Sequence, residues 1–312
     1  MSTTVPPKRI LTSFTDLMGL IRFSHTIFAL PFACLAAIMA ISMPMADGSS
    51  VSLGVAQVAG ILLCMVFARS AAMAFNRLAD HAIDARNPRT ATRHLPRGAL
   101  SRAQVWAFLL VCVIGFIAST ALFLPNRLPL YASMPVLLFL LGYSLAKRFT
   151  AAAHLWLGVA LALAPVCVWV ALRGISTTEP WDDIAPALIL ACAVASWVAG
   201  FDIIYACQDA EFDKNAGLHS IPARLGVRRA LRLASWFHAV TWGCLCFLPA
   251  AAPQLGLGWI YGGALSVIAG LLVYQHRLVR PDDLERVNIA FFNVNATISL
   301  LLLVATGIDC FV

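Results

Sequence analysis

Runs of about 20 mostly apolar residues recur along almost the whole chain, and no other feature limits its fold so strongly. In the hydrocarbon core of a bilayer, only helices and closed barrels satisfy the polar groups of the backbone. The runs have the length of helices, so we predict an all-α membrane protein with nine transmembrane helices in a single domain, residues 1–312. The predicted spans are 20–42, 53–75, 104–124, 129–146, 154–173, 184–206, 233–250, 256–275 and 288–308.

The composition favours a membrane protein over a soluble one. Of the 312 residues, 61% are hydrophobic and 12% are charged, and the mean hydropathy is +0.83. A soluble domain is typically about half apolar and about a quarter charged. We attribute the net charge of +7 to the topology of the chain in the membrane. We predict that the chain has a lipid bilayer as a partner and no nucleic acid. The nine cysteines lack zinc spacing, and no cleavable signal peptide is evident, so the first span is expected to direct insertion.

The basic residues indicate the orientation. Cytoplasmic loops are enriched in Lys and Arg, and with a cytoplasmic N-terminus only Arg127 and Arg173 fall on the other side. We therefore predict that the N-terminus is cytoplasmic, that the C-terminus is outside, and that the protein lies in a bacterial inner membrane. The residues assigned to the cytoplasmic side are Lys8, Arg9, Arg22, Arg77, Arg86, Arg89, Arg93, Arg97, Arg102, Lys147, Arg148, Lys214, Arg224, Arg228, Arg229, Arg232, Arg277, Arg280 and Arg286.

Two acidic motifs follow predicted spans on this side. Asn76, Asp80 and Asp84 are spaced by four residues at the end of the second span, so they share one helix face if the helix continues that far. We call residues 76–98 the first acidic segment. Residues 202–226, the second acidic segment, carry Asp202, Asp209 and Asp213 after the sixth span. The two segments lie four spans apart and form a weak internal repeat.

Carboxylates near the membrane are costly and usually face a cavity or a partner. Two facing carboxylate clusters would repel each other unless cations lay between them. Mg²⁺ fits, because it prefers oxygen ligands and is commonly bound by one or two carboxylates together with substrate phosphates. The neighbouring Arg and Lys side chains could bind the phosphates. A single such motif is more often an interfacial salt bridge, but two on the same side favour a magnesium-bridged diphosphate whose apolar tail lies in the membrane.

The two segments, NRLADHAIDARNPRTATRHLPRG and DIIYACQDAEFDKNAGLHSIPARLG, resemble the aspartate-rich motifs of the UbiA superfamily of intramembrane prenyltransferases. Within it they are most similar to 4-hydroxybenzoate polyprenyltransferases, including those of the futalosine route to menaquinone. The resemblance continues in IRFSHTIFALPFA and LGYSLAKRFT. It departs at His94, where the family usually has proline, and we assign His94 no role.

The resemblance implies nine helices around a central cavity, with residues 76–102 and 207–232 forming a cytoplasmic cap over the active site. It implies Mg²⁺-dependent transfer from a polyprenyl diphosphate to an aromatic acid acceptor similar to 4-hydroxybenzoate, in ubiquinone or menaquinone biosynthesis. By motif position, the expected metal ligands are Asn76, Asp80, Asp84, Asp209 and Asp213. The expected substrate-binding residues are Arg22, Asn76, Arg89, Lys147, Arg148, Tyr205 and Lys214. The expected catalytic residues are Asp80, Asp202 and Asp209, and the base could be Asp202 or Asp209.

Other interpretations remain open at this point. Haem O synthases and homogentisate or chlorophyll prenyltransferases share the two motifs. A transporter would also place polar groups between spans, although its site would lie near the midplane of the bilayer. An interaction scaffold would show no effect of magnesium. His154, His238 and His276 lie near span ends and are predicted to be interfacial.

Overall fold

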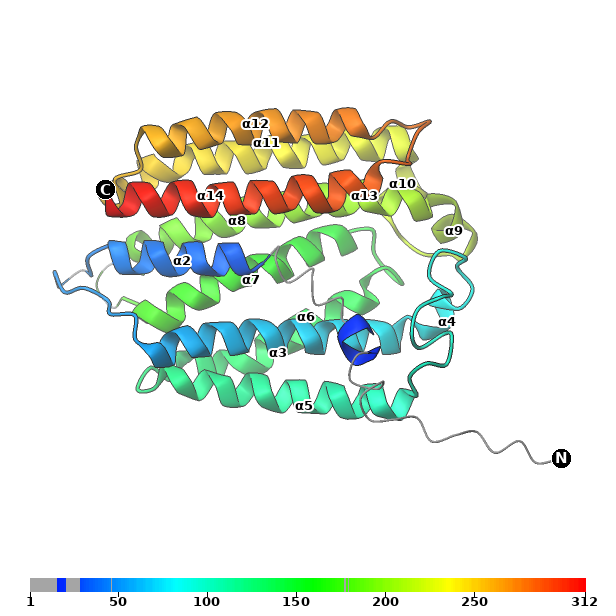
Figure 1. Cartoon of the computed structure of the whole chain (residues 1–312), viewed down its shortest axis with the longest axis horizontal. Helices are drawn as coiled ribbons and strands as arrows, with labels where there is room; N and C mark the ends of the chain where they lie inside the picture. The colour runs from blue at the N-terminus through cyan, green and yellow to red at the C-terminus, as the bar shows by residue number, and fades with distance from the viewer. Residues whose placement is uncertain (1–15, 21–28, 46, 177, 179) are drawn as a thin grey trace.

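The structure is a computed structural model, and it describes residues 16–20, 29–45, 47–176, 178 and 180–312. Its described residues form helices and connecting segments, without a β-strand ladder. Most of the long helices run roughly side by side along the long axis of the molecule (Figure 1). The long helices are α2 (Leu30–Ser42), α3 (Val55–Ala79), α5 (Arg102–Thr120), α6 (Leu128–Ala146), α7 (Ala153–Arg173), α8 (Pro180–Ala206), α11 (Val227–Ala251), α12 (Trp259–Leu278) and α14 (Asn295–Phe311).

Seven stretches of the described chain are helical, long and apolar enough to span a bilayer. They contain α3, α5, α6, α7, α8, α11 and α14, so the all-helical membrane character is confirmed. Of the first predicted span, residues 30–42 form α2, and residues 21–28 lie outside the described chain. The eighth corresponds to α12, which has the length of a span and carries Gln275, His276 and Arg277 in its last turn. The number of nine spans and the orientation of the chain therefore stay predictions.

Helix α8 lies at the centre of the packing. It is apolar on nearly all sides, and it packs against α7 on one side and α11 on the other. A helix that is hydrophobic all round is usually buried by its neighbours. The close approach to α7 depends on Gly158, where an added Cβ would lie 2.2 Å from the carbonyl oxygen of Ala195 in α8.

Replacing Gly158 by Ala is therefore expected to force α7 and α8 apart. Overpacking of this kind typically costs about 1–3 kcal/mol of unfolding free energy, so the melting temperature in detergent should fall by several degrees. Gly270→Ala in α12 is the matched control, because its Cβ would meet nothing within 4 Å. Alanine is a better helix former than glycine, so this control should melt at or above the wild-type temperature. Equal melting temperatures for G158A and wild type would contradict the proposed close packing.

Both acidic segments lie at one end of the bundle, and the C-terminus lies at the other (Figure 1). Helix α3 ends at Ala79, and a short helix α4 (His81–Asp84) follows. Helix α8 ends at Ala206 and is followed by the 3₁₀ turn η3 (Cys207–Asp209), α9 (Ala210–Asn215) and α10 (Ile221–Leu225). The condition for a shared helix face, one unbroken helix through the motif, is therefore not met in either segment. The breaks occur at Asp80 and at residues 207–209, although the backbone N–H of Asp84 still donates to the carbonyl oxygen of Asp80.

Candidate active site

The two acidic segments line a common cavity of about 280 Å³. Residues of α3, α6, α7 and α8 complete its wall. The predicted meeting of the two motifs over one site is therefore present in the structure. The polar side chains that line the cavity are Arg69, Asn76, Arg77, Asp80, Asp84, Asn87, Arg89, Thr90, Arg93, Tyr143, Ser144, Lys147, Arg148, Asp202, Tyr205, Asp209 and Asp213.

In the first segment, two carboxylates have separate basic partners. Asn76 Nδ2 donates to Asp80 Oδ2 over 3.0 Å, and Arg148 Nη2 lies 3.5 Å from Asp80 Oδ1. Arg93 Nη1 lies 2.7 and 2.8 Å from the two carboxylate oxygens of Asp84. The side chain of Asp84 is nearly fully buried, so this pair fixes the chain after α4.

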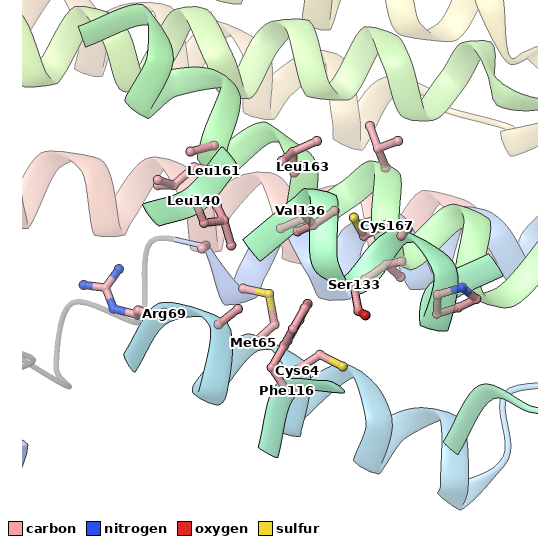
Figure 2. A pocket seen from close by; sticks show the side chains of 18 of the residues that line it. Cys64, Met65, Arg69, Phe116, Ser133, Val136, Leu140, Leu161, Leu163 and Cys167 are labelled. Carbon is pink, nitrogen blue, oxygen red and sulfur yellow. The ribbon is translucent and has the colours of Figure 1, made fainter. Parts of the chain in front are cut away.

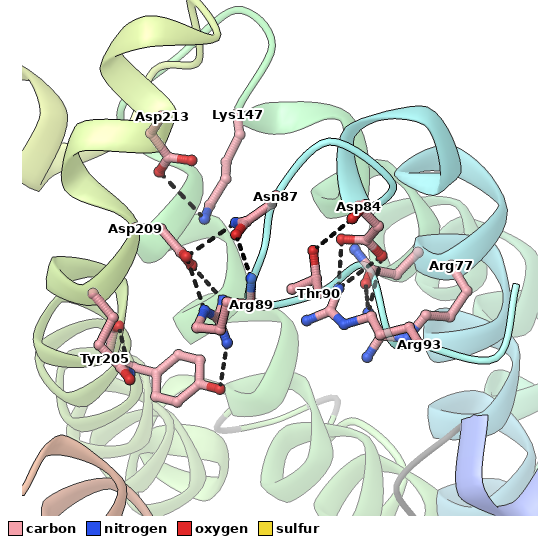
Figure 3. A network of polar contacts seen from close by, with 12 residues as sticks. Arg77, Asp84, Asn87, Arg89, Thr90, Arg93, Lys147, Tyr205, Asp209 and Asp213 are labelled. Carbon is pink, nitrogen blue, oxygen red and sulfur yellow. Dashed lines mark hydrogen bonds and ion pairs between the residues drawn. The ribbon is translucent and has the colours of Figure 1, made fainter. Parts of the chain in front are cut away.

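Hydrogen bonds and an ion pair connect the first segment to the second (Figure 3). Arg89 donates to both carboxylate oxygens of Asp209, with a distance of 2.8 Å from Nε to Oδ1. Asn87 Nδ2 donates to Asp209 Oδ1 over 3.1 Å, and Arg89 Nη1 donates to the hydroxyl of Tyr205 over 3.0 Å. A two-pronged contact of arginine with a carboxylate is strong and geometrically specific. It therefore holds the two acidic segments in one arrangement.

Asp213 has a less complete set of contacts. Its side chain is 5% exposed, and the described residues provide no hydrogen-bond partner for its Oδ2. Lys147 Nζ lies 3.9 Å from this oxygen, which is an ion-pair distance rather than a hydrogen bond. A buried carboxylate oxygen in this situation has capacity for a further ligand.

Asp202 is paired with a histidine that we expected at the membrane interface. His154 is fully buried, and its Nδ1 lies 2.7 Å from Asp202 Oδ2. His238 is also buried, so the interfacial prediction is wrong for both residues. The prediction failed because both side chains form contacts with residues far away in the sequence, His238 with His276 and His154 with Asp202.

The electrostatics favour a bound cation near Asp80. Burial and the neighbouring Asp84 carboxylate raise the pKa of Asp80, and the opposing effects of Arg148 and Lys147 are smaller. A divalent cation between the two carboxylates would reverse this shift, because it stabilises the ionised forms.

No three His, Cys, Asp or Glu side chains come together as a ready-made metal site in the described parts of the chain. The carboxylates contact basic side chains instead, because Arg89, Arg93 and Arg148 lie among them. The donor set still fits Mg²⁺, which is commonly held by one or two carboxylates plus phosphate oxygens. The open Oδ2 of Asp213 and the raised pKa of Asp80 agree with this fit.

Figure 2 shows a second cavity, of about 400 Å³, which shares lining residues with the polar one. Its lining is almost entirely apolar and comes mainly from α3, α6 and α7. Five residues line both cavities, so the two spaces meet: Arg69, Met73, Tyr143, Leu157 and Leu161. The arrangement provides a charged chamber at one end of the bundle and an apolar chamber beside it.

Arg69 is the main residue that sequence reasoning missed. It lies within α3, lines both cavities, and its Nε is buried without a hydrogen-bond partner among the described residues. The available signal was a lone charge inside an apolar span, which usually marks a functional position. Asn87 and Arg93 were also missed, because a polar or basic residue in a cytoplasmic loop is expected for topology alone.

The remaining predicted residues differ in their placement. Arg22 lies outside the described residues. Lys214 is exposed and does not line the cavity, because Asp213 points inward and the next residue on the helix points elsewhere. Its contact with substrate stays a prediction. The other predicted site residues, from both segments and from the residues directly after α6, line the cavity.

An irregular helix places an aromatic ring at the chamber. The π-helical turn η5 (Ala290–Val294) precedes α14 and carries Phe291, whose ring centroid lies 4.4 Å from that of Tyr205. Gln275 and Asn295 donate to the carbonyl oxygens of Ala290 and Phe291 within this turn. π-helical turns are rare and often occur at functional sites.

Comparisons with known proteins agree with this arrangement. The model of the UbiA prenyltransferase family matches residues 30–300. A 4-hydroxybenzoate octaprenyltransferase of Hydrogenovibrio crunogenus is 29% identical over 249 residues, which cover 80% of this chain and 82% of that protein. The apo structure of a UbiA homologue from Aeropyrum pernix K1 is 32% identical, with a TM-score of 0.79 over 92% of this chain and 98% of that one. A UbiA homologue from Archaeoglobus fulgidus bound to DMAPP and Mg²⁺ has the same fold at 18% identity, with a TM-score of 0.71 over 95% and 99% of the chains.

Proposed function

Because the chain belongs to the UbiA prenyltransferase family and is a transferase, we propose that it transfers a polyprenyl group from a polyprenyl diphosphate to an aromatic acid. The acceptor resembles 4-hydroxybenzoate, and the product enters ubiquinone or menaquinone biosynthesis. The observation that carries the proposal is the junction of a chamber rich in carboxylates and cations with an apolar chamber. A diphosphate with a prenyl tail has this same division of polar and apolar parts.

The proposed donor site follows from the two chambers. Arg89, Lys147 and Arg148 bind oxygens of the diphosphate, and the prenyl chain lies in the apolar cavity. The predicted ligands that would hold Mg²⁺ are Asn76, Asp80 and Asp84 in the first segment and Asp209 and Asp213 in the second. When bound, Mg²⁺ supplies positive charge that stabilises the departing diphosphate. The support is the open Oδ2 of Asp213 and the presence of Mg²⁺ with DMAPP in the Archaeoglobus homologue.

The transfer step breaks the C–O bond between the prenyl carbon and diphosphate and forms a C–C bond to the acceptor ring. The apolar wall keeps water from the cation-like prenyl carbon. The π faces of Tyr205 and Phe291 lie at the chamber and would stabilise positive charge there. Arg69 would bind the acceptor carboxylate at the junction of the cavities. The ring carbon that forms the new bond then loses its proton to Asp202.

The proposed setting is a bacterial inner membrane, with the active site on the cytoplasmic side and with residues 76–102 and 207–232 as its cap. The exposed apolar side chains along the spans support contact with lipid. The basic loops around the acidic segments support a cytoplasmic site by the positive-inside rule.

The test is an assay of the purified protein with a radiolabelled polyprenyl diphosphate, Mg²⁺ and either 4-hydroxybenzoate or 6-hydroxy-2-naphthoate. We expect one prenylated product with release of diphosphate, and loss of product when EDTA removes the metal. Absence of product from both acids, together with prenylation of homogentisate or haem, would contradict the proposed acceptor class. Full activity in EDTA would contradict the role of Mg²⁺.

A further inference from the structure

His154 joins three separate parts of the chain beside the polar cavity. It lies in the first turn of α7, contacts Asp202 in α8, and contacts the backbone of Ile221 at the start of α10. Its side chain is 0% exposed, so it cannot touch substrate directly. A fully buried imidazole with a partner at each nitrogen is held in one orientation.

The hydrogen bonds assign the tautomer of His154. The backbone N–H of Ile221 can only donate, and it lies 3.3 Å from Nε2, so Nε2 accepts. The proton is therefore on Nδ1, which donates to Asp202 Oδ2 over 2.7 Å. The backbone contact to the second acidic segment thus determines which nitrogen faces the carboxylate.

One carboxylate oxygen of Asp202 is available to a molecule bound in the polar cavity. Oδ2 is occupied by His154, and no hydrogen bond to Oδ1 is found among the described residues. The Asp202 side chain is 20% exposed and lines the polar cavity. Unlike the other carboxylates of the site, Asp202 has no Arg or Lys ion-pair partner in the described chain.

We propose that His154 is a positioning residue for Asp202, holding Oδ2 so that Oδ1 faces the acceptor. The inference rests on the proposed function, in which Asp202 takes the proton from the ring carbon that has formed the C–C bond. That proton moves to Oδ1, the electron pair of the C–H bond restores the aromatic ring, and the resulting carboxylic acid later loses its proton to water. His154 keeps its own proton throughout and orients the base.

The alternative is that His154 serves only to connect α7 to α10 through its contact with Ile221. Two variants of similar shape distinguish this structural role from the positioning of Asp202. Asn and Leu have nearly the same size and branching, and both are too short to reach the N–H of Ile221. Asn can still donate from Nδ2 to Asp202, whereas Leu cannot. The difference between H154N and H154L therefore isolates the contact with Asp202.

We expect H154L to lower kcat by about 10- to 100-fold, the size of effect that follows a small misplacement of a reacting group. The KM values of both substrates should change by less than about threefold, and H154N should keep kcat within about fivefold of wild type. In a D202N background, H154L should add little further loss, since contacting residues are energetically coupled. Melting temperature and gel filtration check the fold, and H154M replaces H154L if the latter does not purify.

Equal loss of kcat in H154N and H154L would overturn the inference. His154 would then have only the structural role of connecting α7 to α10. Full additivity of H154L with D202N would overturn it as well. These outcomes differ from failure of the proposed function, which would appear in the wild-type protein as absence of prenylated aromatic acid.

Discussion

Replacing Asp209 by Asn is expected to lower the turnover number by about 10²- to 10³-fold, the range seen when one electrostatic contact to a transition state is removed. Asp209 is the point at which the two acidic segments meet, because Arg89 and Asn87 both donate to it. Asn keeps the shape of the side chain but loses the negative charge. It therefore removes a predicted Mg²⁺ ligand and also breaks the two-pronged contact with Arg89.

The measurement is the initial rate of product formation over a series of Mg²⁺ concentrations. D209N should need more Mg²⁺ for half-maximal rate and should stay far below wild type at saturation. Glu211→Gln is the matched control, because Glu211 is an exposed carboxylate of α9 and does not line the cavity. It should retain wild-type turnover. A D209N rate within about threefold of wild type would contradict a role for this carboxylate in binding the metal and diphosphate.

The Arg89–Asp209 pair also shows what the sequence can and cannot predict. The apolar runs predict the helices, and the spacing of Asp80, Asp84, Asp209 and Asp213 predicts two motifs on one side of the membrane. Arg89 is separated from Asp209 by 120 residues, however, and no local pattern indicates which base each acid contacts. The motifs alone predicted metal ligands, and the structure adds the basic side chains that pair with these carboxylates.

His154 and the helix breaks escaped prediction for related reasons. Histidine at a span end is usually interfacial, and only the packing of α7 against α8 places it beside Asp202. The continuation of α3 and α8 through their motifs follows from helical periodicity. The structure instead shows breaks within both motifs, and there Asp84 pairs with Arg93, nine residues away, and Asp209 pairs with Arg89, 120 residues away. Periodicity therefore locates the acidic segments, whereas the basic partners of their carboxylates are known only from the structure.

Substitution of Arg69 is expected to cause the second large loss of activity, because we propose that this residue recognises the acceptor. Its side chain is a cation within an apolar span, and the described residues include no carboxylate that pairs with it. A charge in this position is costly unless a partner is bound. The carboxylate of an aromatic acid would supply that partner at the junction where the ring must meet the prenyl carbon.

We therefore expect Arg69→Met to lower kcat/KM for the aromatic acid by about 10²-fold or more, since losing one partner of a buried charge pair costs about 2–5 kcal/mol. The KM for polyprenyl diphosphate should change little. Arg86→Met is the control, because Arg86 is exposed in the first acidic segment and does not line either cavity. It should behave as wild type in both measurements.

The methyl ester of the acceptor separates recognition of the carboxylate from other effects of the mutation. The ester lacks the negative charge, so wild type should use it poorly, and R69M should use it about as well as wild type does. The ratio of kcat/KM for acid over ester should thus fall in R69M through loss of activity on the acid alone. A proportional loss on both acceptors, with a raised KM for the diphosphate substrate, would place Arg69 beside the diphosphate and leave the acceptor carboxylate to another cation.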